Sequence, residues 1–189
     1  MANTSATSPG TMADDATVGT VAWSNPDNAK VSDDVYATVG VDFAGETSHY
    51  LKATNFGFAI PAGATINGIL VEIETKVHTG TMNAWTNIRI VKGGTISTTT
   101  KAGGSSLTTT DAYYSIPSSG APTDLWGETW TPTDINASTF GAVASQTNNG
   151  AGFRIVSVDH IRITVYYTEV SGATMTGVST IQGLSTITL

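Results

Sequence analysis

The strongest constraint on the fold is a strict two-residue alternation of apolar and polar side chains in two stretches of the chain. Residues 69–77 carry aliphatic side chains on one parity and mostly charged ones on the other, with Ile69, Val71, Ile73 and Val77 set against Leu70, Glu72, Glu74 and Lys76. Residues 161–167 repeat this pattern. Alternation with this period predicts strands that turn one face to a core and the other to water.

Shorter strand candidates and turn residues fill the rest of the chain between residues 18 and 170. Strands are predicted at residues 19–23, 36–41, 49–58, 85–91, 112–116, 140–145 and 153–169. Residues 95–110 are rich in Thr, Ser and Gly, which indicates a long loop or a weak edge strand. In the last candidate the apolar parity slips between Val158 and Ile161, so a β-bulge or bend is expected at residues 157–160.

One short helix is predicted within residues 131–140. Thr131 suits the N-cap, Pro132 suits the first helical position, and Asp134 suits the positive end of the helix. Many short strands, Gly-rich turns and a single helix predict an all-β fold, an antiparallel β-sandwich or barrel. We assign this domain to residues 18–170. Residues 1–17 are small, polar and acidic, and are predicted to form a flexible N-terminal tail.

The last residues of the chain follow a period of three that fits neither a helix nor a strand. Gly, Ser, Thr and Gln fill most of the intervening positions of residues 171–189, and the apolar positions are Met175, Val178, Ile181, Leu184 and Ile187. This pattern predicts an extended assembly arm whose apolar side chains need a surface on another copy or another protein.

Composition excludes several classes of function. The formal net charge is −7 and the eight basic residues are scattered, which argues against a nucleic-acid-binding surface. No stretch approaches the roughly 20 apolar residues of a membrane span, and the first residues lack the features of a Sec signal. We therefore expect no membrane partner and a protein that stays in, or is assembled in, the cytoplasm. The chain has no cysteine, which rules out disulfides and thiolate metal sites, and no cofactor is predicted.

Polar residues offer candidate sites, each with a simpler structural interpretation. Asp159 and His160 are adjacent, but strand neighbours point to opposite faces, so we expect Asp159 to tie a bend through backbone hydrogen bonds. The pair Glu72 and Glu74 is interpreted as a solvated face rather than a glycosidase site. No catalytic residue is therefore predicted.

Neither the histidines nor the loop aspartates predict a metal site. The three histidines, His49, His78 and His160, lack the spacing of a zinc pair. Loop oxygens could bind Ca²⁺, but loop aspartates more often serve turns, so no metal site is predicted for Asp27, Ser32, Asp33 and Asp34.

The tryptophans are the most informative aromatic residues. If exposed, Trp126, Trp130 and Trp85 could stack on glycans or anchor a partner protein. If buried, they would simply fill one end of the domain, which is the more common fate of tryptophan.

Four segments of the chain together suggest a family. They are AWSNPDNAKVSDDVYATV at residues 22–39, YLKATNFGFAIPAGATINGILVEIE at 50–74, WGETWTPTDINASTFG at 126–141 and VDHIRITVYY at 158–167. This combination resembles jelly-roll virion proteins of tailed bacteriophages, including capsid decoration or cement proteins. The resemblance covers roughly residues 20–168 and contains no catalytic motif.

The resemblance implies a jelly-roll β-sandwich, self-association, often as a homotrimer, and no enzymatic activity. We expect a structural protein on the capsid exterior of a virion that is assembled in the host cytoplasm. Its partners would be sister copies and the major capsid protein. The alternative is a carbohydrate-binding or adhesin-type module on a phage tail or particle surface, with surface glycans as ligands.

Overall fold

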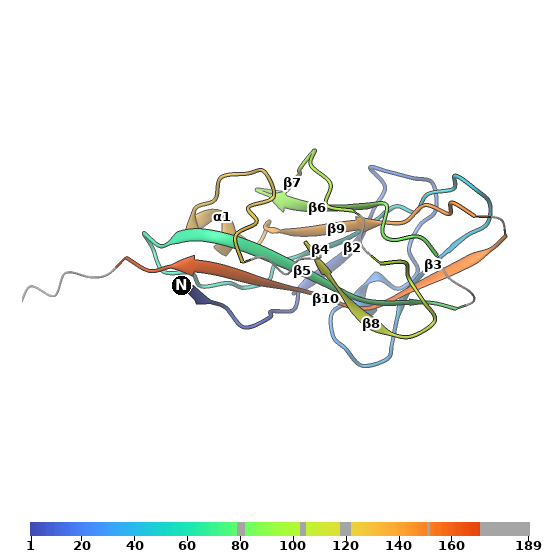
Figure 1. The fold of residues 1–189 in the computed structure, drawn as a ribbon, viewed down its shortest axis with the longest axis horizontal. Coiled ribbons are helices and arrows are strands. Elements are labelled where there is room, and N and C mark those ends of the chain that lie inside the picture. The colour runs from blue at the N-terminus through green and yellow to red at the C-terminus, as the bar shows by residue number, and fades with distance from the viewer. Residues whose placement is uncertain (79–81, 103–104, 118–121, 151, 171–189) are drawn as a thin grey trace, which may run out of the picture.

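The two alternating stretches lie in the two longest strands of the structure, a computed structural model that describes residues 1–78, 82–102, 105–117, 122–150 and 152–170. Two antiparallel sheets of five strands each contain these and the shorter strands (Figure 1). Sheet A contains β1 (Ala2–Asn3), β3 (Ala37–Val41), β5 (Thr65–Val77), β8 (Ala112–Ile116) and β10 (Arg154–Thr168). Sheet B contains β2 (Thr11–Asp15), β4 (Tyr50–Thr54), β6 (Asn87–Lys92), β7 (Thr95–Ile96) and β9 (Gly141–Ser145). The helical elements are the 3₁₀-helix η1 (Pro26–Ala29) and the α-helix α1 (Pro132–Asn136).

The antiparallel pair β5–β10 forms the middle of sheet A. Its register places Ile73 opposite Ile161 and Val71 opposite Ile163, and all four side chains are buried. β8 pairs with the other edge of β5, while β3 and β1 pair with two different parts of β10. The predicted inward faces of residues 69–77 and 161–165 are therefore confirmed, but Thr164, predicted to face water, is buried.

A β-bulge interrupts β10 where the sequence predicts it. Val158 pairs with Thr75 and His160 pairs with Glu74, so Asp159 has no counterpart on β5. The extra residue changes the parity of the strand, which is how Val158 and Ile161 both reach the core. Asp159 and His160 consequently lie together on the outer side of sheet A.

Both sheets contribute side chains to one hydrophobic core. Sheet B supplies Leu51 from β4, Ile88 and Ile90 from β6, and Ala144 from β9. Gly141 begins β9 where β4 comes very close, because a Cβ at this position would lie 1.9 Å from the carbonyl oxygen of Ala53. Each fully buried aliphatic side chain contributes about 1.5–3 kcal/mol to folding before the entropy cost, so this shared core is the main source of stability.

The predicted flexible tail at residues 1–17 is wrong. β1 pairs with β10 through Ala2 and Tyr167, and β2 pairs with β4 through Met12 and Ala53. Met12 is also buried in the core. Backbone hydrogen bonds to the edges of existing strands order this segment, and a count of its hydrophobic side chains does not detect them.

The predicted helix is present, but the first predicted strand is not. α1 has the predicted N-cap, with a capping box in which Thr131 and Asp134 bond each other's backbone amides. Residues 19–23 form no strand and contribute an isolated bridge at Val21.

The five apolar positions of the assembly arm, from Met175 to Ile187, lie outside the described residues. No helix among those described is long and apolar enough to cross a membrane.

Candidate functional site

The three tryptophans singled out in the sequence do not form an exposed aromatic platform. Trp126 is fully buried and donates its indole N–H to the carbonyl of Ile69 at 2.8 Å. Trp85 is buried and stacks on Trp23 with ring centroids 6.4 Å apart. The interpretation of these two residues as glycan or partner contacts is therefore wrong, because core packing takes up their surface.

Trp130 is only half-buried but is also committed to the fold. Its ring packs edge-on against Phe140 with the centroids 5.4 Å apart, and its indole N–H donates to the carbonyl of Leu125 at 2.9 Å. Lys92 lies over the ring, 5.3 Å from its centroid. One partly covered indole does not make the row of rings that sugar stacking requires, so the glycan-binding alternative loses its sequence support.

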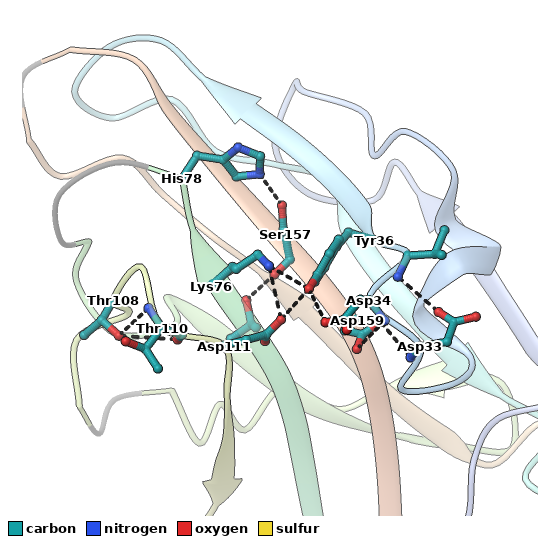
Figure 2. A network of polar contacts seen from close by, with 12 residues as sticks. Asp33, Asp34, Tyr36, Lys76, His78, Thr108, Thr110, Asp111, Ser157 and Asp159 are labelled. Atoms are coloured by element: carbon teal, nitrogen blue, oxygen red, sulfur yellow. Dashed lines mark hydrogen bonds and ion pairs between the residues drawn. The ribbon is translucent and has the colours of Figure 1, made fainter.

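The outer side of sheet A holds a network of polar contacts (Figure 2). Its centre is Asp159, which is 2% exposed and accepts hydrogen bonds from the backbone amides of Asp33 and Asp34 at 3.3 and 3.2 Å. The bulge in β10 is thus tied to the loop before β3, as the sequence interpretation of Asp159 predicts. Burial raises the pKa of the Asp159 carboxyl, the two amide hydrogen bonds lower it, and the charges of Glu74 and Asp111 raise it, with a net upward shift.

His160 does not pair with Asp159, although the bulge puts both on one side of the sheet. Its Nε2 lies 2.9 Å from the hydroxyl of Ser8, and its Nδ1 lies 2.9 Å from the phenol oxygen of Tyr113. Burial lowers the pKa of His160, and nearby Arg162 lowers it further, so the imidazole is neutral at pH 7. Its hydrogen bonds hold the segment before β2 against sheet A, and Asp159 does not orient it as a catalytic base.

Two carboxylates from distant parts of the sequence meet that of Asp159. Oxygen atoms of Asp34, Asp111 and Asp159 all lie within 4.8 Å of one another, and we call these residues the acidic cluster. They come from the loop before β3, the residue before β8 and the bulge of β10. The phenol of Tyr36 bridges two of them, at 2.9 Å from Asp34 and 2.7 Å from Asp111.

The phenol of Tyr36 both donates and accepts hydrogen bonds in the acidic cluster. A phenol has one proton, so Tyr36 can donate to only one of the two carboxylates at a time. Lys76 donates to the phenol oxygen at 2.6 Å, and its Nζ also lies 3.4 Å from Asp111. Burial raises the pKa of Tyr36, and its hydrogen bonds to Asp111 and Asp34 raise it further, so the phenol stays protonated.

The acidic cluster is also the one group of at least three side chains with the ligand spacing of a metal site among the residues that the structure describes. Carboxylate oxygens suit a hard cation such as Ca²⁺. However, Lys76 already provides a positive charge there, and Asp159 already accepts two backbone amides. One buried carboxylate oxygen of Asp111 and one of Glu74 have no hydrogen-bond partner. Leaving these oxygens unpaired lowers the stability of the fold.

The loop residues considered for Ca²⁺ in the sequence differ from the residues of the acidic cluster. Only Asp34 of the four residues considered for Ca²⁺ belongs to the acidic cluster. Asp27 forms an ion pair with Lys30 at 2.8 Å, and Asp33 accepts from the backbone amide of Val35 at 3.1 Å, which is the turn role expected for it. Asp111 and Asp159 were missed as cluster members, because no local spacing links residues so far apart.

The interpretation of Glu72 and Glu74 as a solvated face is wrong for Glu72, and one carboxylate oxygen of Glu74 is buried as well. Its two oxygens accept from Arg162 at 2.8 and 3.1 Å, and its side chain is 15% exposed. Arg162 in turn lies 3.8 Å from the ring centroid of Tyr113. The hydrogen bonds to Glu72 raise the pKa of Arg162, which keeps its guanidinium charged.

The three histidines contact different neighbours and do not form one set of metal ligands. His49 lies 2.8 Å from Asp14, and His78 lies 2.8 Å from the hydroxyl of Ser157. Together with His160, they bond three separate sets of neighbours.

A second candidate surface lies at the connection between β3 and β4. An open pocket of about 490 Å³ is lined by residues 18–20, Phe43 and residues 45–47, and we call it the Phe43 pocket. Phe43 is 62% exposed, whereas Val18 rests on a small apolar cluster on the outer side of sheet B. No local sequence pattern predicts this pocket.

Hydrogen bonds hold the walls of the Phe43 pocket together. The amide of Thr20 donates to the carbonyl of Thr47 at 2.9 Å, and the amide of Gly45 donates to the carbonyl of Asn148 at 2.7 Å. The only charged lining residue, Glu46, accepts from the backbone amide of Asp42. The pocket is therefore preformed, and its one charge is engaged within the loop.

Known proteins give no further guide to either surface. Comparisons with protein-family models, with curated proteins and with solved structures found no match for this chain.

Proposed function

We propose that this chain is a structural virion protein of a tailed bacteriophage, a capsid decoration or cement protein. It lies on the capsid exterior, where it binds sister copies as a homotrimer and the major capsid protein. It is assembled with the particle in the host cytoplasm and performs no catalysis.

The path of the chain between the two sheets carries this proposal. Strands β3 to β10 number eight, and the chain changes sheet at every connection among them except that between β6 and β7. The first of these strands, β3, lies beside the last, β10. Eight strands in two sheets linked in this way are expected of a jelly roll, a fold found in viral capsid and lectin domains.

The role on a virion needs support beyond the fold, since one fold serves many functions. The resemblance of residues 22–39, 50–74, 126–141 and 158–167 to phage virion proteins supplies it. Charged residues make up 12% of the chain, about half the usual share. A surface of this composition suits contacts between proteins that depend little on salt.

Fractionation of purified particles tests the location. Particles of the phage that encodes this chain are purified, and capsids are separated from tails before mass spectrometry. We expect peptides of this chain in the capsid fraction, in a fixed ratio to the major capsid protein. Peptides in the tail fraction alone would contradict the decoration role, and their absence from all particles would contradict the virion proposal.

Truncation after Val170 tests the role of the arm. The described core contains residues from β2 to β10, so we expect the shortened chain to keep its unfolding midpoint in urea. Sedimentation velocity should show that it no longer associates, because the apolar positions from Met175 to Ile187 are gone. A truncated chain that associates as the full chain does would remove the arm from the proposal.

A further inference from the structure

The Phe43 pocket exposes apolar surface that the fold does not use. Phe43 projects from the β3–β4 connection, and the pocket beside it is held open by backbone hydrogen bonds between residues 20 and 47 and between residues 45 and 148. The described part of the chain places no side chain over it. An open pocket with two apolar side chains, Val18 and the exposed Phe43, in its lining offers a docking site for an apolar segment.

We propose that the Phe43 pocket of one copy binds the C-terminal segment, residues 171–189, of a neighbouring copy. This inference rests on the proposed self-association and names the two surfaces that meet. The segment has no charged side chain, and it presents an aliphatic or Met side chain at every third residue from Met175 to Ile187. Its chemistry matches a pocket whose only charge, on Glu46, is already engaged by the amide of Asp42.

The length of the chain decides between the same copy and another. Arg154, at one end of β10, pairs with Val41, which lies two residues before Phe43. Thr168 is at the other end of β10, two residues before Val170. β10 therefore separates the pocket from the start of the segment by about 45 Å, at about 3.3 Å a residue.

The segment itself reaches at most about 65 Å when fully extended. To enter the pocket of its own copy, it would spend most of this length running back along β10. Only residues near Ile187 would then arrive there. A neighbouring copy can offer its pocket close to Val170, so that several of the five apolar positions are available. Binding between copies is therefore favoured.

A segment leaving one end of the molecule and a pocket at the other end make a head-to-tail contact. Such contacts generate closed rings when the rotation closes and open filaments when it does not. A ring that closes after three copies is the homotrimer of the proposed function. Each copy then gives one segment and receives one.

Two full-length variants test the contact by complementation. Phe43→Glu damages the pocket and leaves the segment intact, whereas Leu184→Glu damages the segment and leaves the pocket intact. Each variant alone should associate at least about tenfold more weakly than the unaltered chain in sedimentation velocity, because a charge enters an apolar contact. Mixed in equal amounts, they should form a one-to-one dimer and nothing larger, since only one intact pocket can meet one intact segment.

Controls separate this result from misfolding. Val31→Ser removes a half-exposed apolar side chain from a loop outside the pocket and should associate as the unaltered chain does. Near-ultraviolet circular dichroism reports whether each variant keeps its packed tryptophans, and Phe43→Ala replaces Phe43→Glu if the charge disturbs the loop.

Three results would overturn the inference. They are an unaltered chain that stays monomeric, Phe43 variants that associate normally, and a mixture that forms no dimer. The particle fractionation described above is independent of all three, so the virion proposal and the docking proposal can fail separately.

Discussion

The outer side of sheet A and the Phe43 pocket use polar and apolar groups in opposite ways. The first buries carboxylates, with Asp159 only 2% exposed beneath the loop at residues 32–35. The second leaves Phe43 62% exposed beside an open pocket. A buried carboxylate that accepts hydrogen bonds from backbone amides of its own chain serves the fold, whereas exposed apolar surface that the fold does not need is available to a partner.

The largest effect on stability is expected from Asp159→Ala. The change leaves the amides of Asp33 and Asp34 without their acceptor in a covered site, which costs about 1–3 kcal/mol for groups left unsatisfied. Urea unfolding followed by tryptophan fluorescence measures the loss.

Asp27→Ala is the matched control for that variant, because Asp27 forms a surface ion pair with Lys30. It should change the free energy of unfolding by less than about 1 kcal/mol. Equal losses in the two variants would mean that the buried network is no more important than a surface pair.

The pH dependence of stability gives the second effect. The pKa of Asp159 is raised in the folded state, so its contribution is fully present below its unfolded pKa and is lost as the pH rises through its folded pKa. The free energy of unfolding of the unaltered chain minus that of Asp159→Asn should therefore fall between pH 3.5 and pH 7. A difference that rises over this range would show that the carboxylate is stabilised, not penalised, by its surroundings.

Asp134 provides a contrast of opposite sign. Burial alone would raise its pKa, but hydrogen bonds from Thr131 and the charge of Lys92 lower it overall. Its contribution is present above its unfolded pKa and is lost as the pH falls through its folded value. Asp134→Asn should therefore lose stability at neutral pH, while its difference from the unaltered chain shrinks in strong acid.

Calcium should have the smallest effect. Lys76 and the two backbone amides already compensate the acidic cluster, so we expect Ca²⁺ to leave the thermal midpoint of the chelator-treated chain unchanged. Binding at a concentration one hundred times the dissociation constant would add about 2.7 kcal/mol, which thermal unfolding detects readily. Such a shift, lost in Asp111→Asn, would make the cluster a metal site.

Local patterns in the sequence predict the parts of the fold that depend on neighbours along the chain. The alternation at residues 69–77, the phase slip near Asp159 and the cap at Thr131 each encode a local geometry. Pairing across long distances leaves no such trace. The strand at Thr11–Asp15 exists because β4 offers it an edge, and its own side chains do not predict it.

The candidate sites show the same limit. Asp34, Asp111 and Asp159 meet only because β3 pairs with β10 and β8 pairs with β5 in the same sheet. Whether Trp85 and Trp126 are buried depends on how the two sheets enclose a common core. Phe43 looks in the sequence like any loop aromatic, and only the fold shows that its ring is left outside.

Hydrogen exchange at low and high protein concentration tests the contrast between the two regions within a single sample. Amides of residues 43–47, in the wall of the Phe43 pocket, should become more protected as the concentration rises and neighbouring copies dock. Amides of Asp33 and Asp34, bonded to Asp159, should exchange at the same rate throughout. Concentration-independent exchange at residues 43–47, or protection that grows at Asp33 and Asp34 instead, would contradict the account.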